Sequence, residues 1–102
     1  NFELNVDIEE TGKVISVVGD VFDVKPSEIK GNRRTAYVAQ CRQIVMYILR
    51  KELELPLEKV AKEVNRKDHT TVIHAFEKIE KERETNKSLD EKINMCIRTL
   101  KA

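Results

Sequence analysis

The sequence predicts an all-α domain, a compact bundle of six helices with no sheet. Apolar residues recur at spacings of three and four along most of the chain, which is the period of a helix with one buried face. No segment alternates between apolar and polar residues as a half-buried strand does. With 40% hydrophobic and 36% charged side chains, the 102 residues suffice for one domain with a modest core. We therefore interpret residues 1–102 as a single domain.

The charges are unevenly distributed, although the formal net charge is only +1. Residues 1–24 carry one basic and six acidic side chains, a net charge of −5. Residues 25–74 carry eleven basic and six acidic side chains, a net charge of +5, and residues 75–102 carry seven and six. A concentrated basic block predicts a polyanionic partner even when the total is near neutral.

Capping signals place the helices at the two ends of the chain. Residues 1–24 are expected to form a short lead-in and a first helix, which begins after an N-cap at Asp7 and ends near Phe22. At the other end, Ser88 opens a capping box, Ser-Leu-Asp-Glu, before the last helix.

Between these helices lies a basic loop. Pro26 suits the first turn of a short helix that Gly31 ends. Residues 30–35, Lys-Gly-Asn-Arg-Arg-Thr, form the loop, and Thr35 can cap a long helix over residues 36–53. Such a loop is commonly a solvated linker, but its place in the basic block favours a nucleic-acid contact.

Residues 57–84 predict a helix-turn-helix. A short amphipathic helix over 57–64 is followed by a turn in which Asn65 tolerates a left-handed backbone. Asp68 then caps a longer helix, because its carboxylate can accept from the free N–H groups that follow. The pattern is typical of motifs whose second helix enters the DNA major groove. An αα-hairpin inside a helical bundle is the alternative.

The second helix of this motif has two distinct faces. One face is apolar and is expected to be buried; it comprises Val72, Ile73, Phe76 and Ile79. The other carries cations, hydroxyls and an imidazole, from Lys67, Thr70, Thr71, His74, Lys78 and Lys81. Asp can accept from cytosine N4, and a Thr methyl can pack on a thymine methyl. An arginine in a flanking loop can enter a narrow A·T-rich minor groove.

The residues give no support for catalysis or metal binding. There is no Gly-rich phosphate-binding loop, and His69 and His74 are five residues apart, which prevents chelation from one helix face. Cys41 and Cys96 lack the paired spacing of a zinc site and are expected to be buried free thiols, which suits a reducing cytoplasm. No run is apolar enough for a signal peptide or for membrane insertion.

Two segments carry a resemblance to a known family. The run Lys67–Ala75, Lys-Asp-His-Thr-Thr-Val-Ile-His-Ala, resembles the signature of the C-terminal DNA-binding domain of DnaA, the bacterial chromosomal replication initiator. The Arg42–Arg50 helix resembles that family's Arg-Gln-rich long helix, and with the basic loop the resemblance extends from about Val21 onward. It implies a Trp-repressor-like helix-turn-helix fold that binds double-stranded DNA at DnaA boxes of the replication origin.

The resemblance also implies roles for single residues. The base-reading set is Asp68, His69 and Thr70 in the major groove and Arg34 in the minor groove. The phosphate-binding set is Arg33, Arg42, Gln43, Arg50, Leu57 through its backbone, Lys67, Thr71 and His74. The chain departs from the family pattern at Ala36 and Gln40, which are often basic, at Cys41, which is often Pro, and at Asn65-Arg66, where glycine is common.

By the same resemblance, this domain needs no cofactor. ATP binding and contacts with other copies belong to an AAA+ module upstream, and because the chain begins without Met we expect it to be part of a longer protein. Regulatory proteins are possible further partners, and a cytoplasmic, nucleoid-associated location is expected. Two alternatives stay open: a DnaA-like module of another protein, such as one associated with a transposase, and a helical protein-interaction domain.

Overall fold

The computed structural model describes the backbone of residues 2–32 and 34–102, and the side chains of residues 11–32 and 34–102. Within these residues the chain forms six α-helices and no strand, which confirms the all-α prediction. The helices are α1 (Phe2–Phe22), α2 (Pro26–Lys30), α3 (Ala36–Lys51), α4 (Leu57–Glu63), α5 (His69–Thr85) and α6 (Lys87–Lys101). No helix in this described part is long and apolar enough to cross a membrane.

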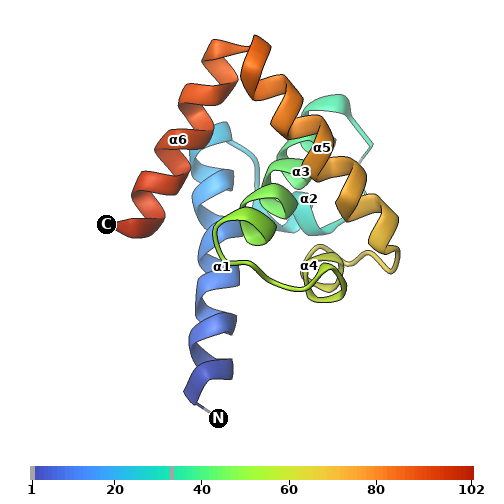
Figure 1. Cartoon of the computed structure of the whole chain (residues 1–102), viewed down its shortest axis with the longest axis vertical. Helices are drawn as coiled ribbons and strands as arrows, with labels where there is room; N and C mark the ends of the chain where they lie inside the picture. The colour runs from blue at the N-terminus through green and yellow to red at the C-terminus, as the bar shows by residue number, and fades with distance from the viewer. Residues whose placement is uncertain (1, 33) are drawn as a thin grey trace.

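The fold is organised around α3. Figure 1 shows α3 at the centre, with α1 and α6 on one side and α5 on the other. α3 packs against α1, α2, α4 and α5, while α6 packs against α1 and α5. The α3 side chains that form the middle of the core are fully buried; they are Cys41, Ile44, Val45, Ile48 and Leu49. The second helix of the predicted helix-turn-helix, α5, therefore rests on the most buried helix of the molecule.

The chain passes through one left-handed residue after each of α1, α3 and α4. The residues in this conformation are Asp23 (φ 57°), Glu54 (φ 53°) and Asn65 (φ 57°). After each, a backbone N–H donates to a carbonyl in the preceding helix: Val24 to Gly19 at 2.9 Å, Leu55 to Leu49 at 3.3 Å and Arg66 to Ala61 at 2.8 Å. The left-handed backbone predicted at Asn65 is confirmed, and it forms the tight link between α4 and α5.

Gly19 allows the chain to leave α1 and turn back. A Cβ atom on Gly19 would lie only 2.6 Å from the Val24 carbonyl oxygen, with the Pro26 ring 3.7 Å away. Glycine weakens a helix interior because it loses more backbone freedom on folding. Only a hydrogen atom fits at this position, so the close approach of the returning chain explains why residue 19 is a glycine.

Two helices begin at residues other than those predicted. α1 begins at Phe2, so Asp7 lies inside the helix and does not cap it; its side chain is outside the described residues. No Gly or Pro between Phe2 and Asp7 stops the helix earlier. α6 begins at Lys87 rather than after Ser88, because Asn86 both ends α5 and caps α6. The Asn86 Oδ1 accepts from the third backbone N–H that follows, at 3.1 Å.

The ends of the basic loop lie where the sequence predicts them. Gly31 ends α2, but with φ −85°, so it does not use the left-handed conformation open to glycine. Thr35 immediately precedes α3, although its side chain makes no capping hydrogen bond. α3 itself ends at Lys51, two residues before the predicted end.

The buried face of α5 is rotated from the predicted one. Val72 and Ile79 are fully buried as expected, and the third buried residue is Ala75. Phe76 is half-buried, whereas Ile73 is 41% exposed, which makes its predicted burial wrong. Ile73 follows Val72 by about 100° around the helix, so a close contact centred on Val72, Ala75 and Ile79 turns it towards solvent.

Candidate nucleic-acid interface

The start of α5 presents polar side chains on a fixed frame. The Asp68 Oδ1 accepts from the Thr70 backbone N–H at 2.9 Å, which confirms the predicted N-cap. Asp68, His69 and Thr70 are all exposed. Because Val72 is fully buried immediately behind them, their position relative to the core is set by helix packing. The first free N–H groups of the helix point the same way, and a helix N-terminus attracts anions.

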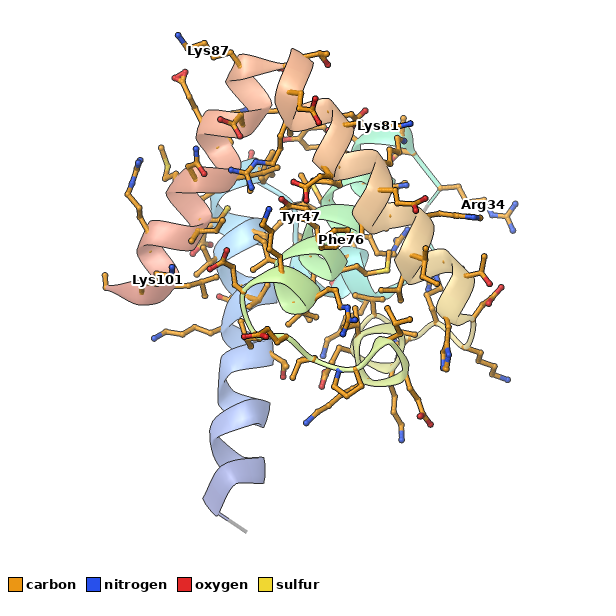
Figure 2. All side chains as sticks on the ribbon, in the orientation of Figure 1. Arg34, Tyr47, Phe76, Lys81, Lys87 and Lys101 are labelled. Carbon is orange, nitrogen blue, oxygen red and sulfur yellow. The ribbon has the colours of Figure 1, made fainter. Side chains whose placement is uncertain are left out.

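A basic cleft separates the loop from the helix-turn-helix. It is open, has a volume of about 620 Å³, and is lined by Asn32, Arg34, Ala39, Arg42, Asn65, Arg66 and Lys67, with no acidic side chain among them. Arg34 is exposed, and Figure 2 shows it projecting outward from the loop. Arg33 lies outside the described residues. The four cations around the cleft come from the loop, α3 and the turn before α5.

The residues implied to bind phosphate lie on both sides of α5. On one side, Gln43, Thr71 and His74 line a hollow of about 210 Å³ between α3 and α5. On the other side, Arg50 and Leu57 line a hollow of about 330 Å³. The exposed N-terminal part of α5 runs between these two sets. Two strands of phosphates flank a DNA groove in the same way, so the arrangement fits a helix lying in a groove.

A scan against protein families matches residues 11–79 to the family described as bacterial dnaA protein helix-turn-helix. The chain belongs to this family. The match runs from the second half of α1 to Ile79 in α5 and confirms the resemblance carried by the Lys67–Ala75 run. The DnaA helix-turn-helix domain binds DNA in replication initiation and is not itself catalytic.

Arg42 holds the DnaA-type domain together as well as lining its cleft. Its side chain is only 6% exposed; Nε donates to the Ile29 carbonyl at 2.7 Å and Nη2 to the Glu28 carbonyl at 3.1 Å. Burial, and then the nearby charge of Arg66, lower the pKa of Arg42 from its ordinary value. A guanidinium remains protonated under these conditions. The cleft therefore contains a fixed cation with a second cation close to it.

Arg50 is held less firmly. Its side chain is exposed, and Nη1 donates to the Leu55 carbonyl at 2.8 Å. Leu57 is the first residue of α4 and is half-buried. Ile73, Phe76 and Glu77 line the same hollow, so this flank of the DnaA-type helix is partly apolar and carries one carboxylate. The flank that contains Gln43 is partly apolar too, through Met46 and Ala75.

A polar network fastens the far half of α5 to its neighbours. The Tyr47 hydroxyl is buried in α3; it donates to Glu80 at 2.8 Å and accepts from Lys51 and Arg83, each at 3.0 Å. The Tyr47 ring packs against Phe76 with centroids 5.0 Å apart, and Figure 2 shows the two side chains together. Arg83 continues the network into α6, where it donates to Asp90 and Asn94, both at 2.6 Å. This network resists rotation of the DnaA-type recognition helix.

One residue of the interface was missed by the sequence reasoning. Arg66 lies in the turn before Lys67, half-buried at the edge of both the cleft and the hollow beside α5. The available signal was a long cationic side chain in the turn, directly before the run that resembles the family signature.

The described residues offer no metal centre. No three His, Cys, Asp or Glu side chains in that part of the chain come close enough to hold an ion. Cys41 and Cys96 are buried and free, as expected, and burial raises the pKa of each thiol to about 11. Both are therefore unreactive thiols that pack as small apolar side chains.

Proposed function

We propose that this domain binds duplex DnaA boxes of a bacterial replication origin, with the start of α5 in the major groove and the basic loop in the minor groove. The observation that carries the proposal is the position of Asp68, His69 and Thr70. They are exposed at the start of α5, between the two sets of side chains that we expect to bind phosphate, and beside a cleft with no acidic side chain in its lining.

In the major groove, Asp68, His69 and Thr70 read base edges. The cap bond uses the Oδ1 atom of Asp68, so Oδ2 is the oxygen that accepts from cytosine N4. Thr70 offers a hydroxyl and a methyl group at the first turn of the helix, and its short side chain lets the backbone approach closely. His69 donates to or accepts from a neighbouring base edge.

Along the sugar-phosphate backbone, contacts come from both flanks of α5. Gln43, Thr71 and His74 face one strand, while Arg50 and the backbone of Leu57 face the other. These contacts fix the register of the helix and carry no sequence information themselves. Lys67 adds a cation at the turn.

The cleft accepts the backbone that separates the two grooves. A helix in the major groove and a loop in the adjacent minor groove must straddle one strand of phosphates, as in homeodomains. The cleft lies between the loop and the turn before α5, and its cations supply the charge that this strand requires. Arg34 then reaches an A·T-rich minor groove, where the negative potential is strongest.

A binding titration tests the proposal. Wild-type protein is measured against a DnaA-box duplex and a shuffled duplex of the same composition, at several salt concentrations. We expect tighter binding of the box by a factor of about 10³ or more, with steep salt dependence for both duplexes. Equal affinity for the two duplexes would overturn the proposal, and a protein-interaction domain would give that result.

Arg34→Ala, compared on boxes with an A·T-rich or a G·C end, tests the minor-groove contact. The matched control is Lys87→Ala. It removes the same charge just beyond the 17-residue α5, about 25 Å from the start of that helix. Arg34→Ala is expected to cost more on the A·T-rich end, whereas Lys87→Ala affects both duplexes equally. An equal loss for Arg34→Ala on both ends would reduce this residue to a plain phosphate contact.

A further inference from the structure

Side chains from distant elements occupy the C-terminal carbonyls of α2. A helix leaves its last four carbonyls without partners inside the helix. In this short helix those carbonyls accept from side chains of α3 and of the turn between α4 and α5. The bonds are Arg42 to Glu28 and Ile29, Asn65 Nδ2 to Lys30 at 3.1 Å, and Arg66 Nη2 to Gly31 at 3.1 Å.

The two turn residues are themselves fixed. Asn65 has φ 57°, and the Arg66 backbone N–H closes the end of α4 by donating to Ala61 at 2.8 Å. The Arg66 Nη1 donates to the carbonyls of Val64 and Asn65, at 3.1 and 3.2 Å, which leaves Nη2 directed at Gly31. The guanidinium thus spans the gap from the turn to the start of the basic loop.

We propose that Asn65 and Arg66 are positioning residues that clamp the start of the basic loop to the helix-turn-helix, so that the minor-groove and major-groove readers bind as one rigid unit. This inference rests on the proposed function. The path through the clamp is short: Arg34 lies three residues after Gly31, and Asp68 lies two residues after Arg66. The clamp therefore controls the spacing between the two readers.

The expected effect is on the contribution of Arg34. A loop that is loose in the free protein must be ordered on binding, and that cost offsets the affinity its side chain provides. Loss of the clamp should weaken binding to a box with an A·T-rich end by roughly three- to tenfold, while a box with a G·C end changes less.

Two substitutions remove the clamp without removing the turn. Arg66→Lys retains the charge but not the planar fork that binds several carbonyls at once. Asn65→Gly retains the left-handed backbone and removes the amide bond to Lys30. Each is made alone and together with Arg34→Ala. Lys62→Gln is the control, because it removes an exposed cation from the neighbouring α4 and leaves both clamp residues in place.

Two measurements decide the result. Amide hydrogen exchange of the free protein should accelerate at residues 31–35 in Arg66→Lys and Asn65→Gly, with α5 unchanged. In DNA titrations, Arg34→Ala should cost less in these two backgrounds than in wild type or Lys62→Gln, and only on the A·T-rich end. The clamp would be overturned if Arg34→Ala lowered the DNA affinity by the same factor in every background. It would also be overturned if the amide hydrogen exchange of the loop were the same in these variants as in wild type.

The clamp and the proposed function fail in different ways. If wild-type protein does not prefer the box to the shuffled duplex, the proposed function fails, and the DNA role of the clamp with it. If the preference is present but Arg66→Lys lowers the affinity for every duplex equally, Arg66 is a phosphate contact and the clamp alone is overturned. Thermal melts of each variant exclude unfolding as the cause.

Discussion

Replacing Arg42 by Met should destabilise the free protein strongly, whereas replacing Arg50 by Met should not. The two arginines lie on the same helix and are both implied to bind phosphate. Arg42 is 6% exposed and donates to two carbonyls of α2, whereas Arg50 is exposed and donates to one carbonyl. Methionine keeps the aliphatic part of the side chain and removes the charge and the donors.

The magnitudes follow from these bonds. A hydrogen bond from a charged donor contributes about 1.5–3 kcal/mol when its loss leaves a buried partner unsatisfied. The bond to the buried Ile29 contributes in full, whereas the Glu28 carbonyl still accepts from the Gly31 backbone N–H and loses less, so Arg42→Met is expected to cost about 2–4 kcal/mol. In a domain of this size that lowers the Tm by roughly 10–20 °C. Solvent replaces the single bond of Arg50, so Arg50→Met should cost below about 1 kcal/mol.

The assay combines two measurements on both variants. Urea denaturation of the free protein gives the free energy of unfolding, and DNA titrations over a range of salt concentrations give the number of phosphates neutralised. At a temperature where both variants are folded, each should lower the magnitude of the log–log salt slope by roughly one. If Arg42→Met unfolds at the wild-type urea concentration, the assignment of its guanidinium to the α2 carbonyls is refuted. An unchanged slope would remove that residue from the DNA interface.

Further predictions concern the turn after α1, the end of α3, the cap of α5 and the Tyr47 network. Gly19→Ala should destabilise the protein by about 1–3 kcal/mol in urea titrations, because the new Cβ meets the returning backbone at 2.6 Å. Glu54→Gly should stabilise it by roughly 0.5–1 kcal/mol in the same assay, since glycine adopts φ 53° without strain. Asp68→Asn should leave the melt unchanged within a few tenths of a kcal/mol, yet relax discrimination at one base pair by about 1–3 kcal/mol on single-mismatch duplexes. The hydrogen bond from Tyr47 and the charge of Lys51 lower the pKa of Glu80 below its ordinary 4.5, so its stabilisation is present above that pH and is lost as the pH falls below it. Glu80→Gln should therefore reduce the fall in the free energy of unfolding that is measured as the pH is lowered from neutral to values below 4.5.

Local signals explain why much of the recognition helix could be predicted from the sequence. The Asp68 cap and the left-handed Asn65 depend on neighbours within three or four residues, so the pattern of the sequence contains all that determines them. The face of α5 was predicted less well, because a period of 3.6 fixes which residues cluster but not which of them meets α3. The small Ala75 lies at that contact, and the larger Ile73 is turned to solvent.

Non-local contacts explain what the sequence could not provide. Arg42 in a basic helix looks like a free cation, and only the position of α2 reveals that its guanidinium serves two backbone carbonyls. Gly19 looks like a weak point in a helix until the returning Val24 carbonyl is placed beside it. Arg66 gives no sign of its role until the loop that starts at Gly31, 35 residues away, is brought within hydrogen-bond distance.

At the basic loop the same residues determine stability and DNA recognition, whereas at the start of α5 different residues determine them. The basic loop is too short to form a core of its own, so its position depends on α2, which Arg42 holds by two bonds, and on the bonds from the helix-turn-helix to Lys30 and Gly31. A change there alters the free energy of unfolding and the placement of Arg34 together. Asp68 and Thr70, by contrast, are exposed residues on a helix whose opposite face is buried, so their outward atoms can change without disturbing the core. Box preference should therefore vary at the start of α5 at little cost in stability, while the loop and its supports resist substitution.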